Sequence, residues 1–277
     1  MDLFLSKTSQ RIGLAIAACI PLLAPLDALA HRQFIVPTST VVSGKAPWVS
    51  FDAAAASDVF FFDHVAMNLN DLVITAADGS TVKAENQSTG KLRSSFDLRT
   101  ELTGTYRIAV VSSGINASYK ENGTTKRWRG TAETFAKEVP ANAEELQASY
   151  NQGRVETFVT NGKPSTTALN ATGKGLELSP ITHPNDLVVG ETAQFRFLID
   201  GKPAAGAKVT VIAGGIRYRQ KLDEQILTTD GDGRVSINWQ GAGLYWIQAN
   251  LSDSKSGIPG VKDRRASYVA TLEVMPQ

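Results

Sequence analysis

Short runs in which apolar and polar residues alternate recur along the chain, and this alternation predicts β-strands. Clear examples are WVSFDA, YRIAVV, AQFRFLID, KVTVIA and VSINW. Dipeptides that favour tight turns lie between such runs; they are Asp78-Gly79, Asn122-Gly123, Asn161-Gly162, Asp200-Gly201 and Asp230-Gly231. Short strands at this spacing, with few helical patterns between them, predict an all-β fold built from β-sandwiches.

A weak internal repeat predicts two tandem Ig-like modules. FDLRTELTGTYRIAV (96–110) aligns without gaps to VSINWQGAGLYWIQA (235–249), so that a Gly-x-Tyr-x-Ile strand closes each module. The module beginnings, 41–51 and 188–197, also correspond. The repeated tyrosine fits the hydroxyl-to-backbone corner of Ig-like domains. The alternative is that Gly-x-Tyr-x-Ile is an ordinary turn followed by an edge strand.

The stretch between the modules has a different composition. Glu144, Glu145 and Leu146 follow Pro140, which predicts a short helix there. The run 165–175 is rich in Ser, Thr, Asn and Gly and is typical of a linker. The predicted organisation is a signal peptide, an N-terminal β-sandwich with a helical insertion, and a C-terminal Ig-like β-sandwich, at 1–30, 31–165 and 176–277.

The first thirty residues have the pattern of a secretory signal peptide. Lys7 and Arg11 precede the apolar run 12–25, which is too short to span a bilayer, and Ala28-Leu29-Ala30 is a small-x-small cleavage site. We therefore expect export to the periplasm, with no transmembrane segment in the mature protein. The alternative is lipidation at Cys19, but the apolar run continues past that cysteine.

Composition excludes several classes of function. The net charge of +1 gives no basis for a nucleic-acid surface. Cleavage after Ala30 removes the single cysteine, and with it disulfides and thiolate metal sites. The chain has no Gly-x-Ser-x-Gly elbow, phosphate loop or dinucleotide fingerprint, so we expect a protein that is not an enzyme.

Three histidines are the candidate metal ligands. Cleavage after Ala30 would make His31 the first residue, where its α-amine and ring Nδ1 can chelate one ion. Nitrogen ligands without thiolate suit Cu(II), Ni(II) or Zn(II). His64 follows Asp63 in an aromatic segment, and His183 precedes Pro184 between the predicted modules. Either could supply a further nitrogen, although each also fits a local structural role.

The segment KRWRG (126–130) is basic and aromatic. It suggests a second function, a metal-independent periplasmic binding or adhesion module that recognises a protein or glycan. The plainer interpretation is a solvated loop with one anchored tryptophan. A third function, an oxidative copper enzyme with an N-terminal histidine brace, lacks a second brace histidine in a suitable sequence context.

Three features together resemble one known family. They are the signal that ends directly before His31, the FFFDH segment, and LELSPITHPNDLVVGETAQFRFLIDGKPAAGAKVTV. The chain is similar to a bacterial periplasmic family described both as a domain of unknown function and as a nickel or cobalt uptake component. The resemblance is strongest over 176–249, which also looks like the sandwich repeats of surface and carboxypeptidase-associated modules.

The resemblance implies a periplasmic, non-enzymatic protein with a part in divalent-metal acquisition. We therefore expect an accessory protein that captures Ni, Co or Cu through His31 and delivers it to a membrane transporter or receptor. The resemblance points to His31 and, less directly, to His64 and His183. The sequence has no histidine-rich tract of the kind that a high-capacity metal buffer would need. We therefore expect stoichiometric binding, or no metal at all.

Overall fold

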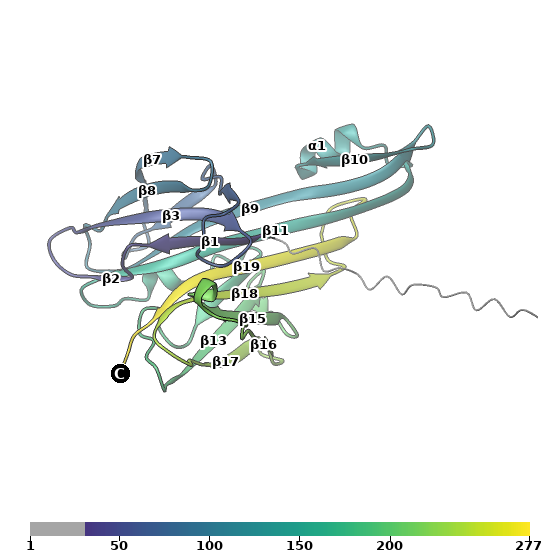
Figure 1. Ribbon diagram of the computed structural model, residues 1–277. Coiled ribbons are helices and arrows are strands. Elements are labelled where there is room, and N and C mark those ends of the chain that lie inside the picture. The colour runs from purple at the N-terminus through teal and green to yellow at the C-terminus, as the bar shows by residue number, and fades with distance from the viewer. Residues whose placement is uncertain (1–30) are drawn as a thin grey trace, which may run out of the picture. The chain divides into compact units, whose positions relative to one another are not determined.

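The alternating runs form three β-sheets in the computed structural model, which describes residues 31–277 (Figure 1). These residues make one compact unit that begins at His31. The predicted cleavage and lipidation sites lie outside the described residues. Within 31–277, no helix is long and apolar enough to cross a membrane.

One outer sheet has five strands and is antiparallel throughout. Its order is β1-β3-β8-β7, with β4 paired to β3. The strands are β1 (Arg32–Pro37), β3 (Trp48–Ala56), β4 (Val65–Ala66), β7 (Glu85–Thr89) and β8 (Ser94–Arg99).

The central sheet has ten strands in the order β16-β15-β18-β19-β11-β9-β5-β6, with β10 paired to β9 and β2 paired to β11. The strands are β2 (Val41–Val42), β5 (Leu72–Thr75), β6 (Thr81–Val82), β9 (Gly104–Glu121), β10 (Thr124–Gly130), β11 (Glu144–Asn161), β15 (Lys208–Ala213), β16 (Gln225–Thr228), β18 (Gly243–Asp253) and β19 (Asp263–Val274). The parallel pairing of β11 with β19 joins strands from the two halves of the chain.

The second outer sheet has four strands, β12 (Leu176–Pro180), β13 (Thr192–Ile199), β14 (Lys202–Pro203) and β17 (Arg234–Asn238). The helical elements are α1 (Ala132–Glu138) and the single 3-10 turns η1 (Thr167–Leu169) and η2 (Ile216–Tyr218).

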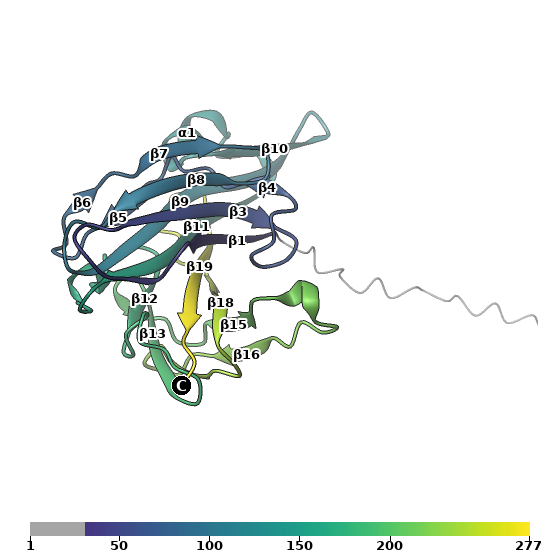
Figure 2. The ribbon, with the colours of Figure 1, turned by 60° about the vertical axis from the view of Figure 1, so that its left-hand side comes forward.

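The two outer sheets cover opposite faces of the central sheet (Figure 2). Successive side chains of a strand point to opposite faces. Val155 and Val159 of β11 therefore join Phe34 and Phe51 in the core under β1 and β3, whereas Phe158 joins the core under β12 and β13. The central sheet thus serves two sandwiches, one on each face.

This architecture confirms the prediction of an all-β fold with β-sandwiches. The division at 31–165 and 176–277 stays a prediction about modules, because strands from both ranges lie in the same sheet. The segment 165–175, expected as a linker, contains η1 and otherwise no helix or strand.

The internal repeat has the same local structure in both copies. Tyr106 Oη donates to the carbonyl oxygen of Leu102 at 3.1 Å, and Tyr245 Oη donates to that of Gly241 at 2.9 Å. Gly104 and Gly243 share a φ of +132°, a conformation that glycine adopts without the strain of a side chain. Each tyrosine therefore forms the predicted corner.

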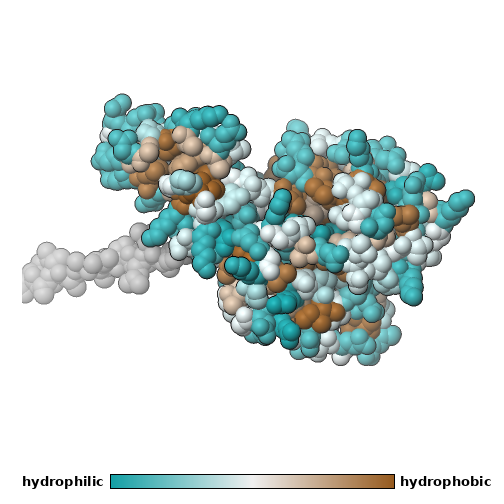
Figure 3. All heavy atoms as spheres, turned by 180° about the vertical axis from the view of Figure 1, so that it is seen from behind, coloured by the Kyte–Doolittle hydropathy of each residue, from teal (hydrophilic) through white to brown (hydrophobic). Residues whose placement is uncertain are grey.

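The position predicted for the short helix is wrong. Glu144, Glu145 and Leu146 begin β11, and the helix lies upstream at Ala132–Glu138. Thr131 and Thr134 form a reciprocal capping box at its start, which stabilises the first turn. The helix packs on the far ends of β9 and β11 through Phe135, in a small apolar cluster with Ile115 and Val139 and others. Figure 3 shows this part, at upper left, as a projection with apolar side chains gathered on the face in view.

Candidate functional site

The structure brings two of the three candidate histidines together. The imidazole rings of His31 and His64 are stacked, with their centroids 3.5 Å apart and their planes 2° from parallel. Both residues are solvent-exposed. His31 immediately precedes β1, and His64 immediately precedes β4, so two separate segments meet at this point.

An aromatic cluster holds the two segments together. Phe34 of β1 is fully buried and packs edge-on against Phe60, at 5.4 Å and 70°, and against Phe62, at 5.6 Å and 66°. Phe60 has a φ of +61°, a strained conformation that persists only where packing enforces it. Because these phenylalanines lie within four residues of a histidine, their packing holds the two histidine-bearing segments side by side.

Polar contacts made by Arg32 reinforce the same arrangement. Its Nη1 donates to the carbonyl oxygen of Ser57 at 2.6 Å and lies 3.9 Å from Asp58 Oδ1. The Asp63 carboxylate accepts a hydrogen bond from the Ser57 backbone N–H at 2.9 Å. Asp63 therefore closes the 57–63 loop, and the structure shows no bond from it to the adjacent His64.

The first strand is also tied to the second half of the chain. Trp246 of β18 is almost fully buried, and its Nε1 donates to the carbonyl oxygen of Gln33 at 2.9 Å. On the other side of the loop, the Arg217 guanidinium lies 4.9 Å above the Phe61 ring. The His31–His64 pair is thus supported by residues from both halves of the chain.

His183 lies in a different environment and does not join the pair. Its Nε2 is 3.0 Å from Thr105 Oγ1 and 3.2 Å from the Ser165 carbonyl oxygen, and its Nδ1 accepts the Asn185 backbone N–H. Partial burial lowers the pKa of this imidazole, which favours its neutral form. These contacts connect the 183–185 turn to β9, which is the local structural role that the sequence allowed.

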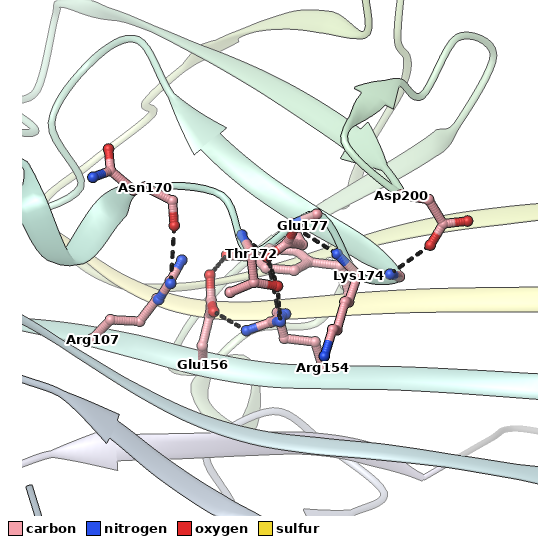
Figure 4. Close-up of polar contacts among 11 residues, drawn as sticks. Arg107, Arg154, Glu156, Asn170, Thr172, Lys174, Glu177 and Asp200 are labelled. Atoms are coloured by element: carbon pink, nitrogen blue, oxygen red, sulfur yellow. Dashed lines mark hydrogen bonds and ion pairs between the residues drawn. The ribbon is translucent and has the colours of Figure 1, made fainter. Parts of the chain in front are cut away.

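A buried cluster of charges, which the sequence analysis missed, lies where the 170–177 segment crosses the central sheet (Figure 4). Arg154 Nη1 is 3.5 Å from Glu156 Oε2, and Arg154 Nη2 is 3.3 Å from Glu177 Oε1. Tyr268 Oη donates to Glu156 Oε1 at 2.6 Å. Burial raises the pKa of the Glu156 carboxyl, and the nearby Arg154 partly opposes this shift.

The same cluster fastens the 170–177 segment to the sheet. The Glu177 carboxylate accepts hydrogen bonds from the backbone N–H groups of Thr172, Gly173 and Lys174, at 2.9, 2.7 and 3.3 Å. Arg107 Nη2 donates to the Asn170 carbonyl oxygen at 3.0 Å. Because most of these charged atoms bind other groups of the chain, the cluster is structural. Alternation along β11 could have placed Arg154 and Glu156 on one face, but not the segment that covers them.

Comparison with family models decides the classification of the chain. The model of "Domain of unknown function (DUF4198)" matches residues 28–253. The chain belongs to this family. The match confirms one part of the predicted resemblance, namely that to a domain-of-unknown-function family. The description of that family names no activity. The link to nickel or cobalt uptake therefore stays a prediction. No curated protein matches the chain.

Solved structures offer only distant likenesses to this DUF4198 protein. A DUF4785 family protein from Legionella pneumophila is 6% identical, with a TM-score of 0.23; the match covers 78% of this chain and 50% of that one. The D0-D1 domain of Intimin is 12% identical, with a TM-score of 0.21 and coverage of 86% and 96%. The chain spans half the length of the first protein. At these TM-scores, the description of the fold rests on its own strand pairing.

Proposed function

We propose that the protein, once cleaved after Ala30, binds one divalent transition-metal ion through His31 and His64. Its role would be that of a non-enzymatic periplasmic accessory protein in the uptake of nickel, cobalt or copper. The stacked pair carries this proposal, because it places two imidazoles from separate segments 3.5 Å apart at the predicted new N-terminus.

The spacing of the rings is compatible with a shared ion. Metal–nitrogen bonds of about 2.0–2.1 Å put two ligand nitrogens of one ion about 3 Å apart. The stacked rings bring nitrogens of His31 and His64 within reach of one ion. Because a nitrogen lone pair lies in the plane of its ring, the two exposed rings must turn out of the stacked arrangement to aim at a common point. The Phe34 cluster supplies the packing that keeps the rings in reach of one another.

A third ligand has to come from the backbone. Among residues 31–277, no three or more side chains of His, Cys, Asp and Glu form a group that could hold a metal ion. The proposal therefore needs the α-amine of His31, which gives three nitrogens with the two imidazoles. Such a donor set suits Cu(II) and Ni(II) better than Ca²⁺ or Mg²⁺, which prefer oxygen. Removal of residues 1–30 would then complete the site.

The solvent exposure of His31 and His64 supports a role in passing a metal ion to another protein. His31 and His64 are both accessible to solvent, so ligands of a membrane transporter or receptor can approach an ion held there. A closed structural site would instead bury its ligands. The resemblance to a nickel or cobalt uptake family supports the same role, and periplasmic localisation follows from the predicted signal peptide.

Calorimetry on three forms of the protein tests the proposal. Protein that begins at His31 should bind one equivalent of Ni(II), Co(II) or Cu(II). One glycine added ahead of His31, or His64→Ala, should each weaken binding about tenfold or more, since each removes a nitrogen ligand. His183→Gln is the matched histidine control and should leave the affinity unchanged. Unchanged affinity of the glycine-extended form would overturn the proposal.

The non-enzymatic part of the proposal has its own test. Copper-loaded protein that begins at His31 is mixed with ascorbate and a polysaccharide, and oxidised products are measured by mass spectrometry. We expect none above the level of free copper. Products that depend on both the reductant and His64 would instead assign an oxidative copper enzyme.

A further inference from the structure

A hollow lies on one face of the central sheet, at the far ends of β10, β9, β11 and β19. Strand pairing sets Arg127 opposite Ser118 and Arg129 opposite Asn116. Residues that pair directly point to the same face of a sheet. The hollow has a volume of about 460 Å³ and is lined by these four residues together with Gln147, Ser149, Asp263 and Arg265. Ala117, Trp128 and Ala148, which alternate with them along the strands, complete the lining.

The opposite face of the same strands is apolar and covered by the helix. Trp128 lies between the two arginines in sequence and therefore points to that face. Its ring packs edge-on against Phe135 of α1 at 5.5 Å and 62°, and its Nε1 donates to Glu138 Oε2 at 2.8 Å. The tryptophan of KRWRG is thus the anchored one that the plainer interpretation expected, and its anchoring leaves Arg127 and Arg129 on the open face.

The charges in this hollow are unbalanced. Three guanidiniums, of Arg127, Arg129 and Arg265, line it together with one carboxylate, of Asp263. All three arginines are exposed, and within residues 31–277 none of them forms an ion pair. Three unpaired guanidiniums in one hollow indicate a site for an anion.

The distance between the arginine-bearing strands favours an extended anion. Arg127 and Arg129 lie on β10, and Arg265 lies three strands away on β19. At about 4.8 Å per strand spacing, the backbones that carry them are about 14 Å apart. The floor between them has amide and hydroxyl side chains, namely Asn116, Ser118, Gln147 and Ser149. Amide and hydroxyl side chains can donate hydrogen bonds to the hydroxyl groups of a ligand and can also accept hydrogen bonds from them.

We propose that this arginine hollow binds an acidic oligosaccharide. Guanidiniums match carboxylates with two parallel hydrogen bonds, and the polar floor matches the sugar hydroxyls between the acidic groups. The hollow is built from residues other than His31 and His64. Saccharide binding is therefore independent of the metal proposal, and either can fail alone.

Calorimetry at low ionic strength, with metal removed by chelation, tests this site. The probe is tetragalacturonate, with maltotetraose as a neutral oligosaccharide of the same length and tripolyphosphate as an anion without sugar hydroxyls. We expect binding of tetragalacturonate that weakens as salt is added. The double variant Arg127→Gln/Arg129→Gln should weaken it about tenfold or more, since charge-assisted hydrogen bonds are lost.

Two control variants sharpen the result. Arg234→Gln removes an exposed strand arginine outside the hollow and should leave the affinity unchanged. Trp128→Phe keeps an aromatic ring against the helix and should also bind normally, whereas a site that stacks sugars on Trp128 would lose affinity. Thermal unfolding of each variant reports whether it is folded.

Three outcomes would overturn the proposal. They are no binding of tetragalacturonate, equal loss in Arg234→Gln and in the double variant, and equal affinity for maltotetraose. Binding of tripolyphosphate as tight as that of tetragalacturonate would overturn the saccharide assignment as well, because the hydroxyls would then contribute nothing.

Discussion

The indole nitrogen of Trp246 donates a hydrogen bond to the backbone carbonyl of Gln33, two residues after His31. The bond joins the first strand of the folded unit to a central-sheet strand from the second half of the chain, across the core that Trp246 shares with Phe34. It therefore helps to fix the backbone from which His31 extends, although Trp246 is distant in sequence.

Trp246→Phe should destabilise the protein by about 1–3 kcal/mol. The change leaves the Gln33 carbonyl without this donor while keeping an aromatic ring in the core. Urea unfolding measures the free energy. Trp48→Phe is the matched control, because Trp48 is 51% exposed and its replacement should change stability by no more than about 0.5 kcal/mol. Equal effects of the two substitutions would contradict the role given to the bond.

Phe62→Ala should weaken metal binding more than Phe61→Ala does. Phe62 packs on Phe34, the residue that holds β1 against the loop, whereas Phe61 is 38% exposed and lies under Arg217. Loss of the Phe62 ring makes the loop that carries His64 more mobile. Metal binding must then order this loop, and the conformational entropy lost in doing so weakens the affinity. Calorimetry with Ni(II) should show about a tenfold loss for Phe62→Ala and little change for Phe61→Ala. The reverse order would show that the cluster does not position the histidines.

The contribution of Glu156 to stability should fall as the pH rises. Burial raises the pKa of this carboxyl in the folded protein, so the folded state holds the proton more tightly than the unfolded state does. Its contribution is full below about pH 4.5, the ordinary value, and is lost as the pH rises through the raised pKa. The difference in unfolding free energy between the wild type and Glu156→Gln should therefore decrease with rising pH.

Urea unfolding of both proteins from pH 4 upward makes that comparison. Glu101→Gln is the control for loss of an exposed carboxylate, since the Glu101 side chain is 70% exposed. A difference for Glu156→Gln that grows with pH would mean that the arginines Arg154 and Arg107 outweigh the cost of burial.

His183 should titrate below the ordinary histidine value of about 6.5. Its burial disfavours the charged ring, and this effect exceeds the opposing influence of the Ser165 carbonyl oxygen. The associated stability is present above pH 6.5 and is lost as the pH falls through the lowered pKa. An NMR titration of the imidazole carbon-bound protons measures the midpoint directly. A midpoint at or above 6.5 would contradict the packing described for this ring.

Features that depend on neighbouring residues could be predicted from the sequence. The corners of Tyr106 and Tyr245 need only a carbonyl four residues earlier, and the repeat that contains them is visible in the chain. The predicted helix is misplaced because Pro140 is not its start signal; the helix ends before Pro140, and β11 begins after it. The capping residues Thr131 and Thr134 were the better signal, since they satisfy backbone groups that a helix N-terminus leaves free.

Features that depend on distant segments could not be predicted. His31 and His64 meet because Phe34 packs on Phe60 and Phe62, and no periodicity in the sequence encodes that contact. The shared central sheet depends on the parallel pairing of β11 with β19, which is set by packing on both faces. Sequence alone could suggest that KRWRG binds a ligand, but not that this segment is a strand whose tryptophan face is covered by α1.

The pairing of β11 with β19 also sets the order in which the protein can fold. Synthesis proceeds from the N-terminus, so β11 is complete once Asn161 has been added. Its partner strand β19 is complete only when Val274 has been added. Until then, the edge of β11 that pairs with β19 is open, and the core around Phe158 lacks the side chains that β19 contributes, Tyr268 among them. Folding through such distant contacts is slow. The last strand of the chain therefore completes the sheet that both sandwiches share, and a chain that lacks it cannot close either core.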